Sequence, residues 1–191
     1  MSNTTTSPGY FEAKYKLAAD PWNFAVSRYE LDRYAAIVAS LKSRRFERAF
    51  EAGCSIGVLT GQLAAFCQHV SALDVSVTAV SRALERCRHL LNVDIGVGSL
   101  LIDVPRGSFD LIILSEIGYY FNPEELASIG KALSVRLRPG GILLGAHWLG
   151  HSDDHLLSGD EVHGIIGSLP DLDLAFSERH YGYRIDHWTK A

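Results

Sequence analysis

Between residues 46 and 148, short apolar runs alternate regularly with helix-like segments, and few folds accommodate such a pattern. Strand-like runs are predicted at 48–52, 69–75, 93–97, 109–115 and 142–148. Amphipathic helices are predicted between them at 57–67, 77–90 and 123–137. The fourth run is almost unbroken in its apolar character, which is typical of a strand covered on both faces. Strands that alternate with helices favour an α/β fold with a doubly wound, mostly parallel sheet.

The residues before this alternation predict a helical cap. Residues 1–9 are polar, lack the apolar centre of a signal peptide and predict a disordered lead-in. Two helices are expected to form the cap at 10–45, the second of them over 29–43. Ser27, with Glu30 three residues later, predicts a capping box at the start of that second helix.

The pattern changes again towards the C-terminus. The sequence Arg138-Pro139-Gly140-Gly141 predicts a helix stop before the last strand of the alternation. Residues 149–191 predict a substrate-side loop, a short helix over 160–168 and two strands that form an antiparallel hairpin. We therefore expect a single domain, 1–191, whose cofactor-binding core at 46–148 is a Rossmann-like, doubly wound sheet.

Composition narrows the class of protein. The 191 residues carry a formal net charge of −4, which argues against a nucleic-acid-binding surface, because such surfaces are basic. No apolar run approaches the roughly 20 residues that a membrane-spanning helix needs. The three cysteines form no C-x-x-C pair, so we expect a cytoplasmic protein without structural zinc. A monomer or weak homodimer is expected, with neither nucleic acid nor a membrane as partner.

A turn of small residues follows the first strand-like run, and an acid stands beside it. Gly53 and Gly57 allow a ligand to approach the main chain closely. Glu51 favours a cationic or amino-bearing ligand over a pyrophosphate, and the turn has no lysine for a phosphate. We therefore predict that this turn, which includes Ser55, binds the methionine end of S-adenosylmethionine. Cys54 is interpreted as a small residue that fits the turn rather than as a nucleophile, because no histidine lies close in sequence.

Further candidates stand where the later strands end, at the edge where doubly wound sheets bind ligands. Asp74 lies roughly 20 residues beyond the glycine turn, a spacing suited to accepting both hydroxyls of a ribose, although it also suits a helix N-cap. Ser99 and Leu100 offer a side-chain oxygen and an apolar wall for an adenine. Val75 and Ser115 complete the predicted cofactor contacts.

Glu116, Tyr119, Tyr120 and His147 are the candidate catalytic residues. A carboxylate and two aromatic side chains directly after a buried strand are costly unless they line a cleft, although one of the tyrosines is expected to pack on the following helix. His147 lies at the end of the last strand of the alternation, and histidine is a suitable general base near neutral pH. Glu116 and His147 are therefore the candidate bases, and the tyrosines are candidate orienting groups.

Together these motifs resemble the class I S-adenosylmethionine-dependent methyltransferases over about residues 46–148. The resemblance is carried by Glu51-x-Gly53-x-x-x-Gly57, Asp74, Phe109-Asp110-Leu111-Ile112 and Leu137-Arg138-Pro139-Gly140-Gly141. Other motifs resemble the narrower NodS-type group, which N-methylates the deacetylated glucosamine end of chitooligosaccharides. They are Tyr10-Phe11-Glu12, Asp20-Pro21-Trp22, Ser27-Arg28-Tyr29-Glu30 and Glu116-Ile117-Gly118-Tyr119-Tyr120.

The resemblance implies the same cofactor contacts and adds three residues of the cap. Trp22, Arg28 and Tyr29 would close over the cofactor, and Arg28 would pair with its carboxylate. Two positions depart from the family pattern, since Ser55 replaces a glycine and Ser99 replaces an acid. An amino sugar or a related small amine is the acceptor that the resemblance implies.

Other functions stay open. An O-methyltransferase for a hydroxylated metabolite shares every cofactor feature, and a catalytically silent binding protein would not need the intact acidic and glycine motifs. An NAD-dependent enzyme is disfavoured because the third glycine of the dinucleotide fingerprint is missing. His147, His151, His155 and His163 suggest a metal site, but their segment resembles a loop and contains no H-E-x-x-H motif, so no metal is expected.

Overall fold

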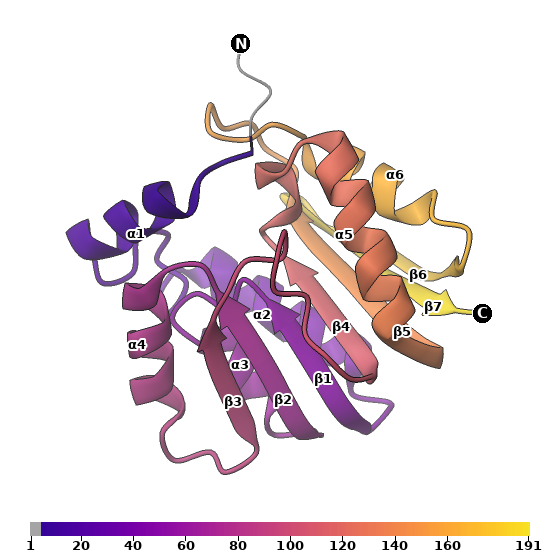
Figure 1. Ribbon diagram of the computed structural model, residues 1–191, viewed down its shortest axis with the longest axis horizontal. Helices are drawn as coiled ribbons and strands as arrows, with labels where there is room; N and C mark the ends of the chain where they lie inside the picture. Colours follow the sequence, from indigo (N-terminus) through magenta and orange to yellow (C-terminus); the bar gives the residue numbers. More distant parts are fainter. Residues whose placement is uncertain (1–4) are drawn as a thin grey trace. The chain divides into compact units, whose positions relative to one another are not determined.

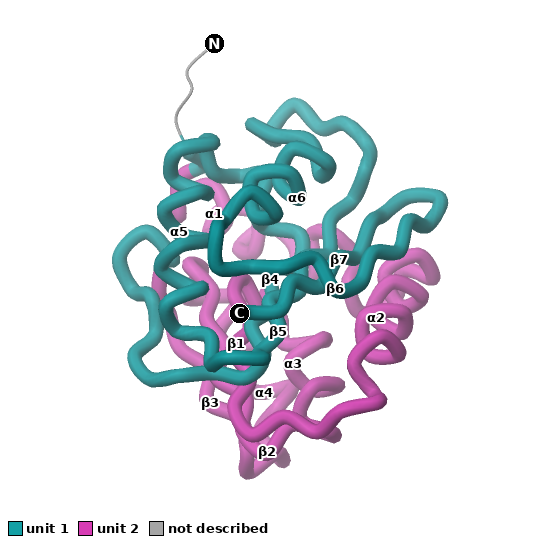
Figure 2. The backbone as a smooth tube through the Cα atoms, turned by 90° about the vertical axis from the view of Figure 1, so that its right-hand side faces the viewer, with its two compact units in different colours: residues 1–6, 100–191 teal, residues 7–99 magenta. Residues whose placement is uncertain are grey.

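The computed structural model describes residues 5–191. Its contacts divide the chain into two compact units, with residues 1–6 and 100–191 in unit 1 and residues 7–99 in unit 2 (Figure 2). Each unit contains its own strands and covering helices. The single domain expected from the sequence stays a prediction.

Unit 2 is built on three parallel strands in the order β3-β2-β1 (Figure 1). Its elements are α1 (Pro8–Leu17), α2 (Arg28–Leu41), β1 (Phe46–Ala52), α3 (Val58–Leu63), β2 (Cys67–Asp74), α4 (Val77–Cys87) and β3 (Val93–Val97). Phe50, Leu63 and Val70 are fully buried. Helix α4 packs against β2 and β3, and α1 packs against α4. The turn after β1 and the acid at the end of β2 therefore lie at the carboxyl ends of neighbouring parallel strands.

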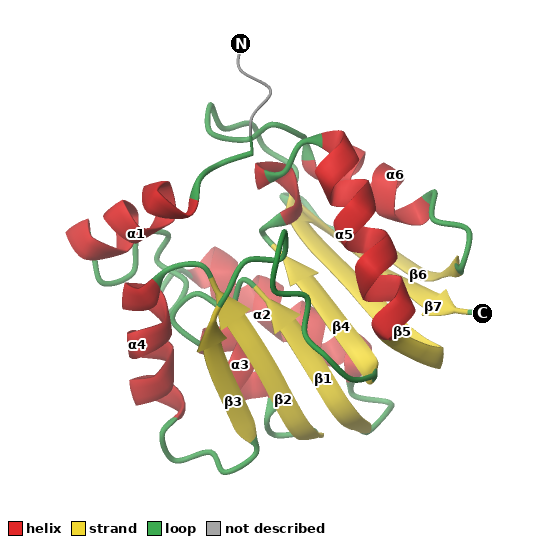
Figure 3. Cartoon of the chain, in the orientation of Figure 1, coloured by secondary structure: helices red, strands yellow, loops and turns green. Residues whose placement is uncertain are grey.

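Unit 1 is built on four strands in the order β4-β5-β7-β6 (Figure 3). Its elements are β4 (Phe109–Ser115), the short 3-10 helix η1 (Gly118–Tyr120), α5 (Pro123–Arg136), β5 (Leu137–Trp148), α6 (Gly159–Gly167), β6 (Leu172–Arg179) and β7 (Tyr183–Lys190). Strands β4 and β5 are parallel, whereas β7 runs antiparallel to both of its neighbours. Helices α5 and α6 lie side by side and contact β5.

The predicted fold class is confirmed: strands alternate with helices, most strand pairs are parallel, and the chain ends in an antiparallel hairpin. The strands at 93–97 and 109–115 have the predicted bounds. Helix η1 was not predicted, because three residues carry no readable periodicity. Among the described residues, no helix is both long and apolar enough to span a membrane.

The predicted stop at 138–141 is partly wrong. Helix α5 does end at Arg136, but residues 138–141 belong to β5 rather than to a loop. Leu137 pairs with Phe109 and Ile142 pairs with Leu111, so β5 advances by five residues (142 − 137) while β4 advances by two (111 − 109). The extra residues form a bulge, in which Gly140 supplies a positive φ of 71°.

The capping box predicted at Ser27 and Glu30 is also wrong. Ser27 is the N-cap residue of α2, but its side chain accepts no capping hydrogen bond. The Glu30 carboxylate instead pairs with the buried Arg33 guanidinium, at 2.5 Å. The ion pair therefore takes the Glu30 carboxylate that a capping box would need.

The N-terminal cap begins earlier than predicted. Helix α1 begins at Pro8, inside the predicted lead-in at 1–9. Proline suits the first turn of a helix because the N–H that it lacks has no intrahelical partner there. The lead-in at residues 1–4 lies outside the described residues.

Candidate active site

The glycine turn after β1 is held by backbone hydrogen bonds from β2. The N–H groups of Gly53 and Cys54 both donate to the Leu73 carbonyl, at 2.8 and 2.9 Å. Gly53, Ser55 and Gly57 all have positive φ, at 70°, 51° and 77°. A Cβ at Gly57 would also lie 3.0 Å from the Ala83 Cβ, so glycine is required there for both reasons.

Ser55 adopts a left-handed backbone conformation in this turn, although it is not a glycine. A left-handed backbone costs a non-glycine residue roughly 1–3 kcal/mol. Two hydrogen bonds offset that cost: the Ser55 N–H donates to Asp74 Oδ2 at 2.9 Å, and its hydroxyl accepts from the Tyr15 hydroxyl at 2.5 Å. Tyr15 was not predicted as a site residue, because nothing in the sequence links positions 40 residues apart.

Glu51 ends up almost fully buried, at 3% exposure. The Thr60 hydroxyl donates to Glu51 Oε2 at 2.5 Å. Burial raises the pKa of Glu51 to about 8, and the nearby Asp74 adds to this shift while the Thr60 hydrogen bond opposes it. The carboxyl group is therefore largely protonated at neutral pH until a cationic group comes close.

Asp74 lies at the end of β2 and organises the two segments beside it. Its Oδ1 accepts from the Ser76 N–H and its Oδ2 from the Ser55 N–H, both at 2.9 Å. Its carbonyl accepts from Gly98 N–H at 3.0 Å, at the start of the Gly98-Ser99 segment. Each carboxylate oxygen has two lone-pair sites, so these contacts leave acceptor capacity compatible with a ribose diol.

Cys54 has the surroundings of a structural thiol. It is buried, and burial is the main cause that raises its pKa well above the usual value. A thiol of this kind is protonated and unreactive at neutral pH. Its environment is thus the one expected of a small residue that fits the turn.

Of the three predicted cap residues, Trp22 belongs to an aromatic cluster. Trp22 and Tyr15 have ring centroids 5.4 Å apart, and Trp22 packs with Ile56 of the glycine turn. Tyr29 is half-buried in the first turn of α2. Arg28 is exposed and pairs with Asp32 at 2.9 Å. Its predicted contact with a cofactor carboxylate would have to replace or share that ion pair.

Helix α1 is tied to α4 by two charged side chains, Glu12 of α1 and Arg82 of α4, which the sequence analysis missed. The Glu12 carboxylate accepts from the Ser76 hydroxyl, the Thr78 hydroxyl and the Thr78 N–H. Arg82 donates to the carbonyls of Tyr15, Ala18 and Ala19, at the C-terminal end of α1. The hydrogen bonds from Ser76 and Thr78 lower the pKa of Glu12 to about 2.

In unit 1, Glu116 follows β4 in a left-handed conformation, with a φ of 59°. Its Oε1 accepts from the Trp148 N–H and its Oε2 from the Tyr119 hydroxyl, both at 2.7 Å. The Glu116 N–H donates to the Ala146 carbonyl at 2.9 Å. A strained residue persists only where its surroundings fix it, and strain of this kind concentrates at functional sites.

Tyr119 and Tyr120 are both buried and pack on each other, with ring centroids 5.1 Å apart. The His155 ring stacks on Tyr119 at 3.7 Å and meets the Trp148 ring edge-on at 6.0 Å. Burial lowers the pKa of His155, so this ring is neutral at neutral pH. Tyr119 is thus both a hydrogen-bond donor to Glu116 and part of an aromatic wall.

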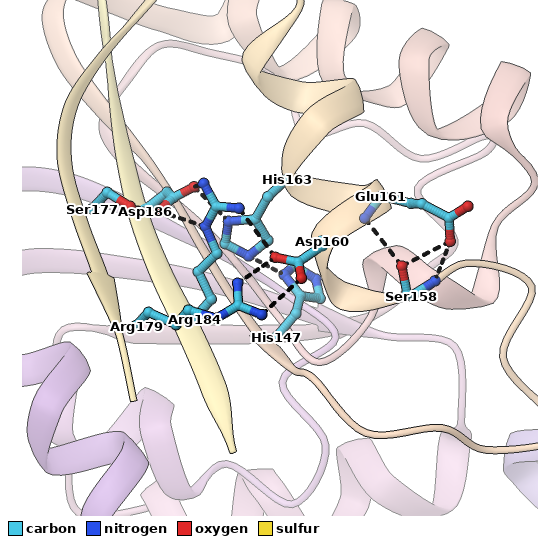
Figure 4. A network of polar contacts seen from close by, with 9 residues as sticks. All are labelled: His147, Ser158, Asp160, Glu161, His163, Ser177, Arg179, Arg184 and Asp186. Carbon is cyan, nitrogen blue, oxygen red and sulfur yellow. Dashed lines mark hydrogen bonds and ion pairs between the residues drawn. The ribbon is translucent and has the colours of Figure 1, made fainter. Parts of the chain in front are cut away.

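His147 belongs to a buried chain of polar contacts (Figure 4). Its Nε2 accepts from the Gly118 N–H, and its Nδ1 lies 3.1 Å from His163 Nε2. His163 Nδ1 lies 2.8 Å from Asp186 Oδ2. His147 stays a prediction as general base, but the lone pair needed for that task already binds Gly118. The geometry therefore favours Glu116 over His147.

The remaining predicted cofactor residues are divided between the units. Val75 and Ser99 are half-buried in unit 2, and Leu100 is buried in unit 1. The Ser115 hydroxyl, at the end of β4, is buried with no hydrogen-bond partner among the described residues. Such an orphaned hydroxyl fits a site where a polar ligand binds. The residues present are thus compatible with the predicted cofactor, and their contacts with it stay predictions.

The histidines considered for a metal site have other surroundings. Within residues 5–191, no three histidine, cysteine or acidic side chains form a group arranged to hold a metal ion. His147 and His163 point their ring nitrogens at each other, and His155 stacks on Tyr119. Each of these rings therefore has a contact that accounts for its position.

Comparison with known proteins identifies the family. The family model "Nodulation protein S (NodS)" matches residues 12–147. Nodulation protein S of Sinorhizobium fredii is 30% identical over 145 residues, and that of Rhizobium tropici is 33% identical over 147 residues. Both alignments cover 73% of this chain, and they cover 66% and 60% of the relatives, so the chain spans less than two thirds of the curated relatives' length.

The fold has a counterpart of known structure. The N-methyltransferase NodS of Bradyrhizobium japonicum, solved in complex with S-adenosyl-L-homocysteine, matches with a TM-score of 0.84 at 20% identity. The match covers 97% of this chain and 99% of that one. Since the family model matches most of the sequence and the fold agrees, this chain belongs to the nodulation protein S (NodS) family.

Proposed function

We propose that this chain is an S-adenosylmethionine-dependent N-methyltransferase whose acceptor is an amino sugar, such as the deacetylated end of a chitooligosaccharide, or a related small amine. Family membership and the cofactor-type motifs of unit 2 support the reaction class. The three free, buried cysteines support a reducing, cytoplasmic setting as part of the same proposal. A monomer or weak homodimer also belongs to it.

In unit 2, each residue proposed to hold the cofactor has a separate task. Glu51 accepts hydrogen bonds from the ammonium of the methionine part, while the glycine turn allows the cofactor to approach the main chain closely. Asp74 accepts hydrogen bonds from the ribose hydroxyls through lone pairs that Ser55 and Ser76 do not occupy. When bound, S-adenosylmethionine supplies a methyl group on a positively charged sulfur.

The observation that favours an amine acceptor is the fixed carboxylate of Glu116. An acceptor-only carboxylate attracts an ammonium or amine and accepts its proton. Transfer of a methyl group to an amine would leave the nitrogen with one proton too many, and Glu116 would take that proton, directly or through water. The Trp148 N–H and the Tyr119 hydroxyl keep the carboxylate oriented while this happens.

The variant Glu116→Gln tests this assignment, because it keeps the size of the side chain and removes its charge. We expect kcat to fall by about a hundredfold, within the range that general bases contribute. Affinity for S-adenosylhomocysteine, measured by isothermal titration, should stay within about twofold, because Glu116 is assigned to the acceptor.

Two results would contradict the proposal in different ways. If the wild-type protein binds no S-adenosylhomocysteine in the titration, the whole methyltransferase proposal fails. If it binds normally and Glu116→Gln keeps full turnover, only the task assigned to Glu116 fails. Methyl transfer to phenols but not to amines would instead support an O-methyltransferase.

A further inference from the structure

We propose that Asp186 and His163 are positioning residues of the reaction, which act by fixing the tautomer of His147. In that tautomer the His147 ring accepts the Gly118 N–H and so holds the segment that presents Glu116. This inference rests on the proposed task of Glu116, but the hydrogen-bond chain itself does not. Neither Asp186 nor His163 was predicted to contribute to the reaction from the sequence.

The donor and acceptor in each of these hydrogen bonds can first be assigned from the Gly118 end. A backbone N–H only donates, so His147 Nε2 must carry a lone pair. A neutral imidazole has one donor and one acceptor nitrogen, so His147 Nδ1 carries the proton and donates to His163 Nε2. His163 then carries its own proton on Nδ1 and donates it to Asp186.

The Asp186 end requires the same direction independently. Burial alone would raise the pKa of Asp186, but hydrogen bonds from His163, Ser177 and Arg184 outweigh it and lower that pKa. The distances are 2.8 Å from His163 Nδ1, 2.6 Å from the Ser177 hydroxyl and 3.1 Å from Arg184 Nε. An ionised carboxylate only accepts, so His163 Nδ1 must be the donor.

Burial makes this arrangement hard to replace with water. His147, His163 and Asp186 are 1%, 2% and 1% exposed. They come from β5, α6 and β7, and Figure 4 shows the side chains meeting between these elements. Changing the partner at one end therefore changes which nitrogen of the next ring carries the proton.

Three hydrogen bonds join residues 116–118, after β4, to the end of β5. The Gly118 N–H donates to His147 Nε2, the Trp148 N–H donates to the Glu116 carboxylate, and the Glu116 N–H donates to the Ala146 carbonyl. A Cβ on Gly118 would lie 2.4 Å from Val162 Cγ1 and 2.9 Å from His147 Nε2, so the backbone packs directly on the ring. The tautomer of His147 thus controls one of the attachments that fix the left-handed Glu116.

An added proton disrupts the chain. It places an N–H on His147 Nε2 opposite the Gly118 N–H, or it places two N–H groups opposite each other between the rings. The geometry of the hydrogen bonds therefore fits a pair of neutral rings. Asp186, Tyr119 and Trp188 contact the histidine pair. Arg184 binds Asp186, and Asp160 and Arg179 lie farther along the network.

The test compares variants of the hydrogen-bonded residues Asp186 and His163 with a control variant in α6, the helix that carries His163. Asp186→Asn keeps shape but removes the charge, and we expect kcat to fall about ten- to a hundredfold, as for other outer-shell partners of a functional histidine, with cofactor KM unchanged. His163→Phe should lose as much, and His163→Gln, which offers one donor and one acceptor, should recover part of the loss.

Ser158→Ala is the control. It removes the capping box at the start of α6, the helix that carries His163, without touching the histidine pair. We expect a lower thermal midpoint and an unchanged kcat for the folded protein. A loss of turnover in Asp186→Asn but not in Ser158→Ala therefore separates tautomer control from stability.

Nitrogen-15 NMR of the histidine side chains reads the tautomer directly. The wild-type protein should show a protonated Nδ1 and an unprotonated Nε2 at His147, and this pattern should change in Asp186→Asn. A protonated Nε2 at His147 in the wild type would overturn the inference. Wild-type turnover in Asp186→Asn would also overturn it, provided that Glu116→Gln is inactive. Full turnover in Glu116→Gln would instead refute the task proposed for Glu116.

Discussion

At the scale of single residues, burial and hydrogen bonding together decide which charge a carboxyl group carries. Glu51 and Glu12 lie in the same unit, but their pKa values are shifted in opposite directions. Burial raises the pKa of Glu51 to about 8, whereas hydrogen bonds from Ser76 and Thr78 lower that of the half-buried Glu12 to about 2. The sequence indicated Glu51 as an acid beside a glycine turn, but its protonation depends on packing that only the structure reveals.

The raised pKa of Glu51 predicts that cofactor binding releases a proton. The unliganded carboxyl is protonated below about pH 8, and an ammonium beside it favours the ionised form. Affinity for S-adenosylhomocysteine should therefore rise with pH up to about 8 and then level off, because the free protein no longer holds the proton. Calorimetry at pH 7 in buffers of different ionisation enthalpy should detect the release of close to one proton.

Thr60→Val is the matched variant for this measurement. It removes the hydrogen bond that lowers the pKa of Glu51, so the pH range of proton release should move upward. Binding that is independent of pH between 6 and 8, with no proton released, would show that Glu51 does not meet the ammonium.

At the scale of elements, the bounds of apolar strands that end at turn residues were predictable, whereas contacts between residues distant in sequence were not. Strand β4 has the predicted bounds because all of its residues are buried and most of them are apolar. The start of β5 was misplaced because the glycine-rich residues predicted as a helix stop form a bulge within the strand. The contacts that dock α1 join residues more than 60 positions apart, so no local spacing could indicate them.

The docking of α1 predicts a measurable change in amide exchange. Glu12→Gln weakens the contact with the N-terminus of α4, and Arg82→Gln removes the contacts with the end of α1. In either variant the amides of α1 should exchange several-fold faster without cofactor, because local opening becomes easier. The predicted mobility of the cap without cofactor stays a prediction, which the wild-type exchange rates would test.

Glu85→Gln is the control for these two variants. Glu85 lies on α4 like Arg82, but it pairs with the exposed Arg88. Its removal should leave exchange in α1 unchanged. Equal exchange rates in wild type, Glu12→Gln and Arg82→Gln would mean that other contacts hold α1.

At the scale of the whole molecule, motif order was sufficient to predict the fold class and the family. Both depend on short motifs placed at the ends of successive strands. The chain from Gly118 to Asp186 was not predictable, because its links span 29, 16 and 23 residues across separate elements. The histidines were noticed in the sequence, but only their facing ring nitrogens distinguish a hydrogen-bond chain from a metal site.

Acceptor choice is the least predictable property for the same reason. The matched family model ends at residue 147, and the later segments supply Trp148, His155 and His163, which contacts the His147 ring. The cofactor motifs are shared by N- and O-methyltransferases, so they do not distinguish the two. The carboxylate of Glu116 is the feature that favours nitrogen.

Transfer of labelled methyl groups to a matched pair of acceptors tests the central claim most directly. One acceptor is a chitooligosaccharide with a free amine at its deacetylated end, and the other is the same oligosaccharide fully N-acetylated, so that hydroxyl groups are common to both. The account predicts label only in the first acceptor and only on its nitrogen. Equal labelling of both acceptors, or label on oxygen, would contradict it.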